Sequence, residues 1–337
     1  MNLDPETIRP LPWHAQPWQR VQDAIRAGQL GHALLLAGPA GVGKRRFAGR
    51  LAARLMCETP DADGEACGRC RGCAQTLAGS HPNLSWLQRE FNDRKDKLKR
   101  DISMEQLRRM MESLSLSSHY GRNRMVVIDP ADAMNASGVN AVLKTLEEPP
   151  PGVHLVLISE RPMALAPTLR SRCQRLVFAL PDPALSCQWL QEQPGQFDAP
   201  TTLAEAGNAP LAALEDQQSG LAEQRLAWTE TLLALANRRC DPLGAAAQVD
   251  KDRVVAWLKV FQRCLQRILL ALAGVDADPG WRAVSLRLRG AQVERLLAEA
   301  VDAQRRLGSN ANPQLLVESL MILWWHLSEP PQNRGAS

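Results

Sequence analysis

Gly38-Pro-Ala-Gly-Val-Gly-Lys44 is a nearly complete phosphate-binding loop, and Arg45 follows it directly. In a working P-loop the backbone amides cradle phosphate, the lysine reaches the β- and γ-phosphates, and a following Ser or Thr hydroxyl ligates Mg²⁺. The glycines Gly38, Gly41 and Gly43 and the amine of Lys44 are present, but Arg45 replaces the hydroxyl. The motif predicts a nucleotide-binding fold that has lost part of its catalytic equipment. It leaves open whether the loop still holds ADP or ATP.

The segments around this loop have the pattern that a P-loop fold requires. A short apolar run at 32–37 leads into the loop, and residues 45–56 carry apolar side chains at helical spacing. Two more short apolar runs lie at 125–128 and 155–158, with an amphipathic helix over 139–146 between them. Buried strands alternating with helices are typical of a parallel sheet covered on both faces. We therefore expect residues 1–180 to form an α/β domain.

Beyond residue 180 the strand pattern fades and helical periodicity takes over. Residues 181–222 predict a small helical domain interrupted by Pro and Gly, and 223–330 predict an all-helical bundle. The helices expected in and around the bundle cover 221–238, 251–273, 290–306 and 313–327. The last seven residues, 331–337, are expected to form a flexible tail.

Four cysteines in a turn-rich stretch have the spacing of metal ligands. Cys57, Cys67, Cys70 and Cys73 lie in an insertion, about 57–73, after the P-loop helix. Two-residue spacings let neighbouring thiolates converge on one ion, and four thiolates complete a tetrahedral Zn²⁺ site. The sequence therefore predicts a closed, structural zinc site rather than four unrelated cysteines.

Composition favours a cytoplasmic protein without a nucleic-acid surface of its own. The 337 residues are 45% hydrophobic and carry a net charge of +4, too little to indicate direct nucleic-acid binding. The charged stretch 91–109 mixes both signs and lacks a set of stacking aromatics, which favours a solvated loop. No secretory or membrane-spanning pattern is visible, so we expect a cytoplasmic location, reduced thiols and no membrane partner.

A second catalytic position departs from the ATPase pattern. Asp129 follows the strand expected at 125–128, where an acid that holds Mg²⁺ would lie, but the next residue is Pro130, which has no ionisable group. The sequence leaves open whether Asp129 is such an acid or caps a turn. Arg45 and Pro130 both indicate a site without efficient hydrolysis.

Several stretches together resemble the bacterial DNA polymerase III clamp-loader subunits, a family of AAA+ proteins. They are Asn140-Ala-Val-Leu-Lys-Thr-Leu-Glu-Glu-Pro-Pro150, Leu169-Arg-Ser-Arg-Cys173, the four-cysteine insertion and Leu307-Gly-Ser-Asn-Ala-Asn-Pro-Gln-Leu-Leu-Val-Glu318. The resemblance covers about 15–325. It is strongest to the delta-prime type, because gamma and tau keep an intact P-loop and an Asp-Glu pair where this chain has Asp129-Pro130.

The resemblance implies an AAA+ α/β domain, a helical lid and a helical collar that oligomerises. It also implies that Arg172 acts in trans as an arginine finger in the ATP site of a neighbouring subunit. Ser159 occupies the sensor 1 position. Pro210 stands in the segment where an Arg-bearing sensor 2 would lie, a further indication of a silent site.

The function implied is that of a non-motor subunit of the replicative clamp loader, within the DNA polymerase III holoenzyme. Its expected partners are the gamma/tau and delta subunits, the sliding clamp and, through the complex, primed DNA. Two rival functions remain: an active gamma-type ATPase, which Arg45 and Pro130 disfavour, and a zinc-dependent nucleic-acid-binding protein, which the weak net charge disfavours.

Overall fold

The computed structural model describes residues 8–92, 97–99, 101–115, 123–195, 198–275, 278–307 and 311–329. These residues form two compact units. Unit 1 comprises Met1–Leu203 and Asn208–Leu214, and unit 2 comprises Ala204–Gly207 and Glu215–Ser337. The three-part division into 1–180, 181–222 and 223–330 stays a prediction, and the tail expected at 331–337 lies outside the described residues.

A five-stranded parallel sheet forms the centre of unit 1. Its strand order is β2-β5-β6-β1-β7, and every neighbouring pair is parallel. The strands are β1 (Ala33–Ala37), β2 (Leu84–Leu87), β5 (Arg124–Ile128), β6 (Val153–Ser159) and β7 (Gln174–Val177). This sheet and the helices that cover it confirm the predicted fold class.

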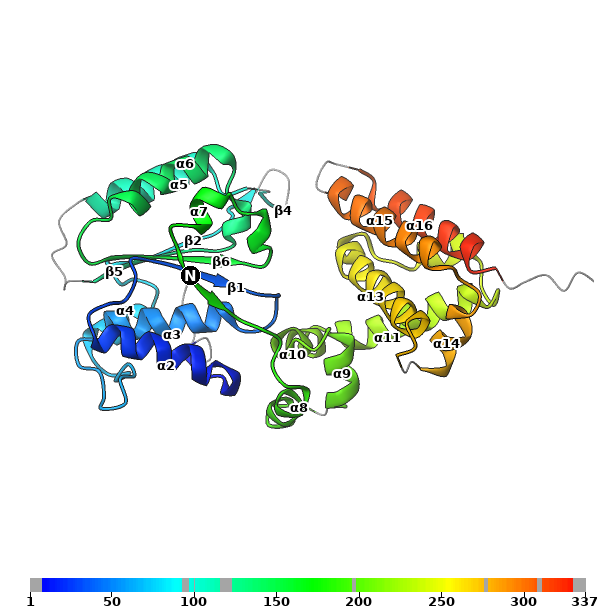
Figure 1. Cartoon of the computed structure of the whole chain (residues 1–337), viewed down its shortest axis with the longest axis horizontal. Helices are drawn as coiled ribbons and strands as arrows, with labels where there is room; N and C mark the ends of the chain where they lie inside the picture. Colours follow the sequence, from blue (N-terminus) through cyan, green and yellow to red (C-terminus); the bar gives the residue numbers. More distant parts are fainter. Residues whose placement is uncertain are drawn as a thin grey trace, which may run out of the picture. The chain divides into compact units, whose positions relative to one another are not determined.

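Helices cover both faces of the sheet, and the alternation of side chains along each strand decides what they pack against (Figure 1). On β1, Leu34 and Leu36 join the core beneath α2 and α3, whereas Leu35 joins the core beneath α5 and α6. The helices on the first face are α2 (Ala15–Arg26), α3 (Lys44–Met56) and α4 (Arg71–Leu77). Those on the second are α5 (Met104–Ser115), α6 (Ala136–Glu147) and the short α7 (Pro167–Arg170).

The loop expected over the charged stretch 91–109 was wrong. The described part of this stretch contains a short antiparallel pair, β3 (Phe91–Asn92) with β4 (Lys97–Leu98), and the start of α5. Residues 93–96 and 100, which carry several of its charges, lie outside the described residues. Ser103 and Gln106 bond each other's backbone amides at the start of α5, so the helix begins with a reciprocal cap.

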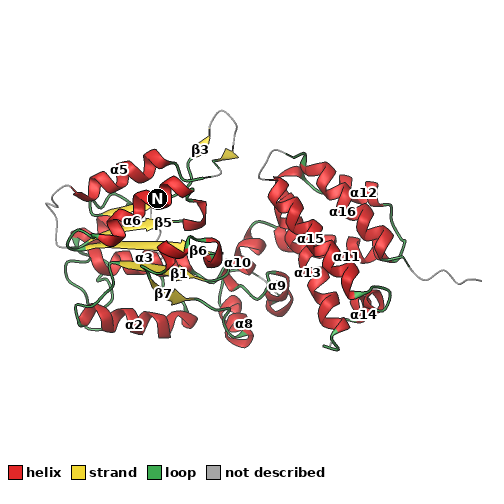
Figure 2. Cartoon of the chain, turned by 45° about the horizontal axis from the view of Figure 1, so that its top comes forward, coloured by secondary structure: helices red, strands yellow, loops and turns green. Residues whose placement is uncertain are grey.

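The described part of the segment after residue 180 contains helices joined by loops and no strand, as Figure 2 shows by colour. The helices at its start are α8 (Pro183–Gln191), α9 (Ala199–Glu205) and α10 (Pro210–Gln218). The bundle that follows contains α11 (Leu221–Ala236), α12 (Pro242–Ala247), α13 (Val254–Leu272), α14 (Pro279–Ser285), α15 (Gly290–Leu307) and α16 (Pro313–Leu327). Its four long helices confirm the four expected from the periodicity.

Large aromatic side chains form the core of unit 2. Trp257 stacks on Phe261 with ring centroids 5.3 Å apart, and Trp281 and Trp324 are also fully buried. The indole of Trp324 donates to the backbone oxygen of Leu232 at 2.9 Å, so its polar atom is satisfied inside the core. None of the described helices is both long and apolar enough to span a bilayer.

Candidate functional site

The P-loop has the conformation that its glycines predict. It joins β1 to α3, and Gly41 and Gly43 have φ of 74° and 94°, a region that L side chains rarely adopt. A Cβ on Gly38 would lie 2.1 Å from the backbone oxygen of Phe178, so only glycine fits beside the strand end. The loop therefore keeps its glycine-dependent shape although Arg45 follows Lys44 in place of Ser or Thr.

Lys44 is directed back onto its own loop. Its amine donates to the backbone oxygens of Gly38 and Pro39, at 2.7 and 2.5 Å, and only 5% of the residue is exposed. Burial lowers the pKa of this amine from its ordinary value. A phosphate would have to draw the ammonium away from two carbonyl acceptors before it could use this charge.

Arg45 forms an ion pair with Asp129, the acid that follows β5. Its Nε donates to Oδ2 of Asp129 at 2.6 Å, and Gln88 Nε2 approaches the same oxygen at 3.4 Å. The Asp129 side chain is 1% exposed, whereas that of Arg45 is 57% exposed. Arg45, which stands where a working P-loop has its Mg²⁺-ligating hydroxyl, thus places a cation on the carboxylate. Asp129 acts as an ion-pair partner, a role that neither sequence interpretation included.

Asp132, a second acid near the P-loop, accepts hydrogen bonds at the end of β6. Asp132 accepts a hydrogen bond from the hydroxyl of Ser159 at 2.7 Å and from the backbone amides of Glu160 and Arg161 at 2.9 and 3.3 Å. Ser159 is fully buried at the end of β6. These bonds fix the strand end and occupy both carboxylate oxygens of Asp132.

Two aromatic residues just before α2 contact the P-loop. Trp13 and His14 both contact the backbone oxygen of Val42 at 2.9 Å. His14 is 2% exposed and packs edge-on against Phe47 and Phe178. Burial lowers the pKa of His14 to about 4, so the imidazole is neutral at physiological pH. The sequence carries no signal for these residues, because a Trp-His pair outside the motif has no recognisable spacing.

Arg172 lies apart from the P-loop, in the turn after α7. Its guanidinium bonds Oε1 of Glu147 at 2.7 Å and the backbone oxygen of Thr168 at 3.0 Å. The two charged side chains are 38% and 52% exposed. The geometry is that of an ion pair at the protein surface, and the trans role of Arg172 stays a prediction.

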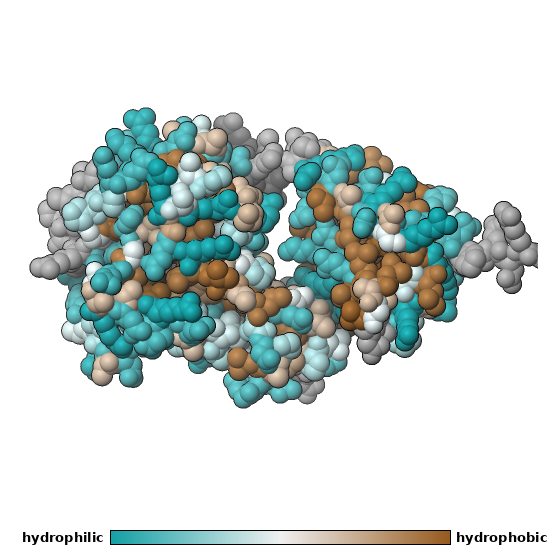
Figure 3. Space-filling model, in the orientation of Figure 1, coloured by the Kyte–Doolittle hydropathy of each residue, from teal (hydrophilic) through white to brown (hydrophobic). Residues whose placement is uncertain are grey.

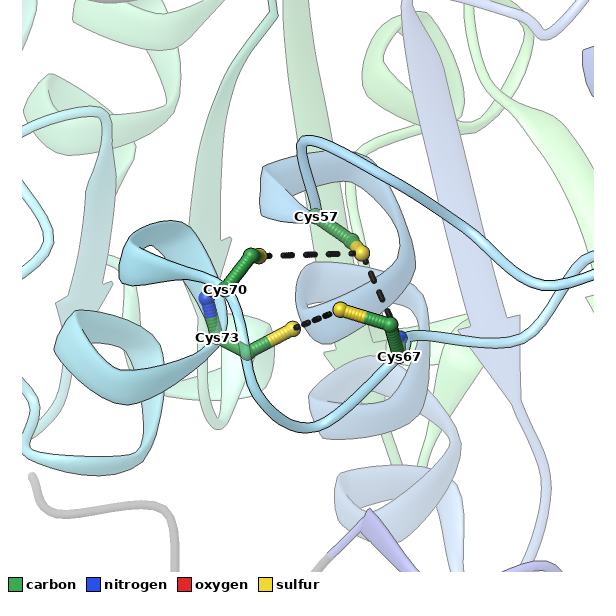
Figure 4. Close-up of side chains that lie close together, drawn as sticks. All are labelled: Cys57, Cys67, Cys70 and Cys73. Carbon is green, nitrogen blue, oxygen red and sulfur yellow. Dashed lines mark hydrogen bonds between the residues drawn. The ribbon is translucent and has the colours of Figure 1, made fainter.

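The four cysteines of the insertion converge, as Figure 4 shows. Their sulfur atoms all lie within 4.8 Å of one another, and the pairs Cys57–Cys70 and Cys67–Cys73 are 3.9 and 4.0 Å apart. Tetrahedral Zn²⁺ with Zn–S bonds of about 2.3 Å places its sulfurs about 3.8 Å apart. This group of cysteines can therefore hold a metal ion such as zinc.

Backbone amides and one hydroxyl also point at these sulfurs. The amides of Glu58 and Cys73 approach Cys70 Sγ at 3.5 and 3.4 Å, and the amide of Cys67 approaches Cys57 Sγ at 3.3 Å. The hydroxyl of Thr59 donates to Cys67 and, together with the backbone amides of Arg69 and Cys70, lowers the pKa of that thiol to about 6. Donors of this kind stabilise thiolates, the form that binds metal.

The cysteine knuckle, residues 57–73 of unit 1, is held against α2 and α3. Glu65 accepts from the indole of Trp18 at 2.5 Å and pairs with Arg50, whose guanidinium lies 3.9 Å from the Trp18 ring centroid. Cys57 follows the last residue of α3, a 13-residue helix that begins at Lys44. At 1.5 Å per residue this separates the knuckle from the P-loop by about 20 Å. The metal site is therefore structurally separate from any nucleotide chemistry.

Comparison with known proteins identifies the family. The family profile described as "DNA polymerase III, delta subunit" matches residues 13–182, just over half of the chain. The chain belongs to this family. DNA polymerase III subunit delta-prime of Pseudomonas aeruginosa is 38% identical over 215 residues, 62% of this chain and 63% of the relative. The chain thus matches less than two thirds of that relative's length.

More distant relatives include the tau type. DNA polymerase III subunit tau of Salmonella typhimurium is 28% identical over 307 residues, 90% of this chain and 44% of the relative. Among solved structures, a DNA polymerase III gamma subunit-related protein of Thermotoga maritima is 15% identical, with a TM-score of 0.44, over 92% of this chain and 99% of that one. The predicted resemblance to DNA polymerase III clamp-loader subunits of the delta-prime type is confirmed.

Proposed function

We propose that this chain is a non-motor, delta-prime-type subunit of the replicative clamp loader. In this role it helps the ring to open the sliding clamp and place it on primed DNA in the cytoplasm. It works with gamma/tau and delta subunits inside the DNA polymerase III holoenzyme, and it has no ATPase activity of its own.

The ion pair between Arg45 and Asp129 is the observation that carries this proposal. Mg²⁺ needs an anionic oxygen ligand at the strand end, and the guanidinium already neutralises the Asp129 carboxylate at 2.6 Å. Lys44 is bonded to the loop, and Pro130 offers no group to orient an attacking water. Three separate requirements for hydrolysis are unmet at one site.

Arg172 would provide the chain's catalytic contribution in trans. A guanidinium that enters a neighbouring ATP site stabilises the charge on the transferring phosphoryl group, an effect of about 10³–10⁵ in rate in other systems. Support comes from its place in the Leu169–Cys173 motif and from its partial exposure. The cysteine knuckle would hold a structural Zn²⁺, because four thiolates fill a tetrahedral site and leave no position for substrate.

The test is ATP hydrolysis by the purified chain, alone and then mixed with gamma/tau and delta subunits. We expect no turnover by the chain alone, and turnover in the mixture that falls at least a hundredfold on Arg172→Ala. Turnover by the chain alone that disappears on Lys44→Ala would instead establish the rival function, an active gamma-type ATPase. Turnover in the mixture that is unchanged by Arg172→Ala would remove the trans role.

A further inference from the structure

Arg172 forms an ion pair with Glu147, an acid at the C-terminal end of α6, where a negative charge is unfavourable. Glu147 is the last residue of α6, where the helix dipole is negative and disfavours a carboxylate. The adjacent Glu148 experiences the same dipole, and Lys144 is the basic residue of this last turn. Glu147 therefore contributes little to the stability of α6, and its ion pair with Arg172 is the contact that accounts for it.

The backbone segments that carry Glu147 and Arg172 are both anchored in the core of unit 1. Leu146, next to Glu147, is 3% exposed, and its backbone oxygen contacts His32 Nε2 at 3.1 Å. On the other side Leu169 is fully buried, and Cys173, next to Arg172, packs against the same core. The backbones that carry the acid and the base are thus fixed, while the side chains that meet remain accessible.

Among the described residues, the guanidinium of Arg172 contacts two acceptors. Its two terminal nitrogens bond Glu147 and the backbone oxygen of Thr168, and a guanidinium has five N–H groups. A long arginine side chain that is held at two points loses little further entropy when it meets a phosphate. An exposed ion pair of this kind contributes little to the free energy of unfolding. Its main effect is then to restrict the orientation of the Arg172 side chain.

We infer that Glu147 is a positioning residue for Arg172, which it holds in the orientation that enters the ATP site of the neighbouring subunit. This inference rests on the trans role proposed for Arg172. Of the two acids after Leu146, Glu147 orients the guanidinium of Arg172, and Glu148 does not.

The experiment measures ATP hydrolysis by the complete mixture of this chain with gamma/tau and delta subunits. Glu147→Ala is expected to lower kcat about three- to fivefold, the range that an exposed ion pair can supply, with KM for ATP unchanged. Glu147→Gln keeps an oxygen acceptor for the guanidinium and should retain more of kcat than the alanine variant. Glu148→Ala removes the same charge one residue away and should behave as the unchanged chain.

A double variant separates this inference from the function on which it rests. If Glu147 acts through Arg172, then adding Glu147→Ala to Arg172→Ala should cause no further loss. A full effect of Arg172→Ala together with unchanged kcat for Glu147→Ala would overturn the inference and leave the proposed function standing. Unchanged kcat for Arg172→Ala would overturn both. A change in KM for ATP, or equal losses of kcat for Glu147→Ala and Glu148→Ala, would also overturn the inference. Either result would show that Glu147 acts only through the surface charge of the chain.

Discussion

At the scale of single residues, one residue that departs from the P-loop pattern supports the proposal that this chain does not hydrolyse ATP. Arg45 not only lacks the metal-ligating hydroxyl but also supplies the cation that neutralises Asp129. The sequence indicated each departure separately, but it could not indicate the pair, because the partners lie 84 positions apart. Their meeting depends on β5 lying next to β6, and β6 next to β1, in the sheet. That order is a property of the fold, not of either motif.

Removing the Arg45 side chain should therefore leave the buried carboxylate of Asp129 without its ion-pair partner. We expect Arg45→Ala to lower the free energy of unfolding by about 1–3 kcal/mol, because Asp129 stays buried without its ion-pair partner. Asp129→Ala should give a smaller loss, since Arg45 is largely exposed and can turn to water. Urea unfolding of both single variants and the double variant measures the coupling, and additive losses would contradict the pairing.

His14 should make stability depend on pH. Its pKa is about 4 when it is folded against Val42 and 6.5 when it is free, so the unfolded chain binds the extra proton first as the pH falls. Stability is complete above pH 6.5 and decreases as the pH falls toward 4, by about 3 kcal/mol in all for this group. His81 and His154 also have lowered pKa values, so the contribution of His14 requires a difference measurement.

The matched variant is His14→Gln, which keeps an N–H that can donate to Val42 but cannot titrate. Between pH 5 and 7 the stability of the unchanged chain should fall more steeply with acidification than that of the variant. Parallel curves from urea unfolding across this range would show that the buried imidazole does not contribute.

At the scale of elements, the sequence predicted the strands that are buried on both faces and missed those at the edges. The central strands β1, β5 and β6 are almost continuously buried, so they read as apolar runs. All four residues of β2 are half-buried, and three of the four in β7 are exposed, so neither shows that pattern. Both lie at the edges of the sheet, where water replaces one neighbour.

The cysteine knuckle is the element whose geometry depends most on a ligand. Cys70→Ser removes one of four thiolates and should abolish stoichiometric zinc and lower the melting temperature, because metal binding contributes to folding. A serine at this position can still accept from the amide of Cys73 and cap α4, so the loss reports the metal. Metal content of the purified chain, with a melting curve, measures both effects. Cys187→Ser, on α8 and outside the knuckle, is the control and should keep the metal. Full zinc content in the Cys70 variant would contradict the site.

At the scale of the whole molecule, unit 2 carries apolar surface that its own core does not use. Figure 3 shows hydrophobic side chains gathered over the part of this unit that contains α13. On that helix Val255 and Leu270 are 48% and 51% exposed, although the opposite side of the helix is buried, and Leu272 at its last position is 42% exposed. Exposed Lys259 and Gln266 lie between Val255 and Leu270, so the outer side of α13 is mixed, with an apolar residue toward each end. Exposed apolar side chains of this kind can contribute to an interface. The periodicity predicted the bundle, but it could not show which apolar residues the core leaves outside.

If this face takes part in the proposed collar, one charge there should prevent assembly without unfolding the chain. Leu270→Glu is expected to weaken association with gamma/tau and delta subunits at least tenfold, because a carboxylate would lose its water in the contact. Its melting temperature should stay within a few degrees, since the position is half exposed. Leu243→Glu, on α12 and 52% exposed, is the matched control and should assemble normally. Size-exclusion chromatography with light scattering distinguishes the outcomes: normal assembly by both variants would place the interface elsewhere on unit 2, and failure of both would implicate a broader surface than α13.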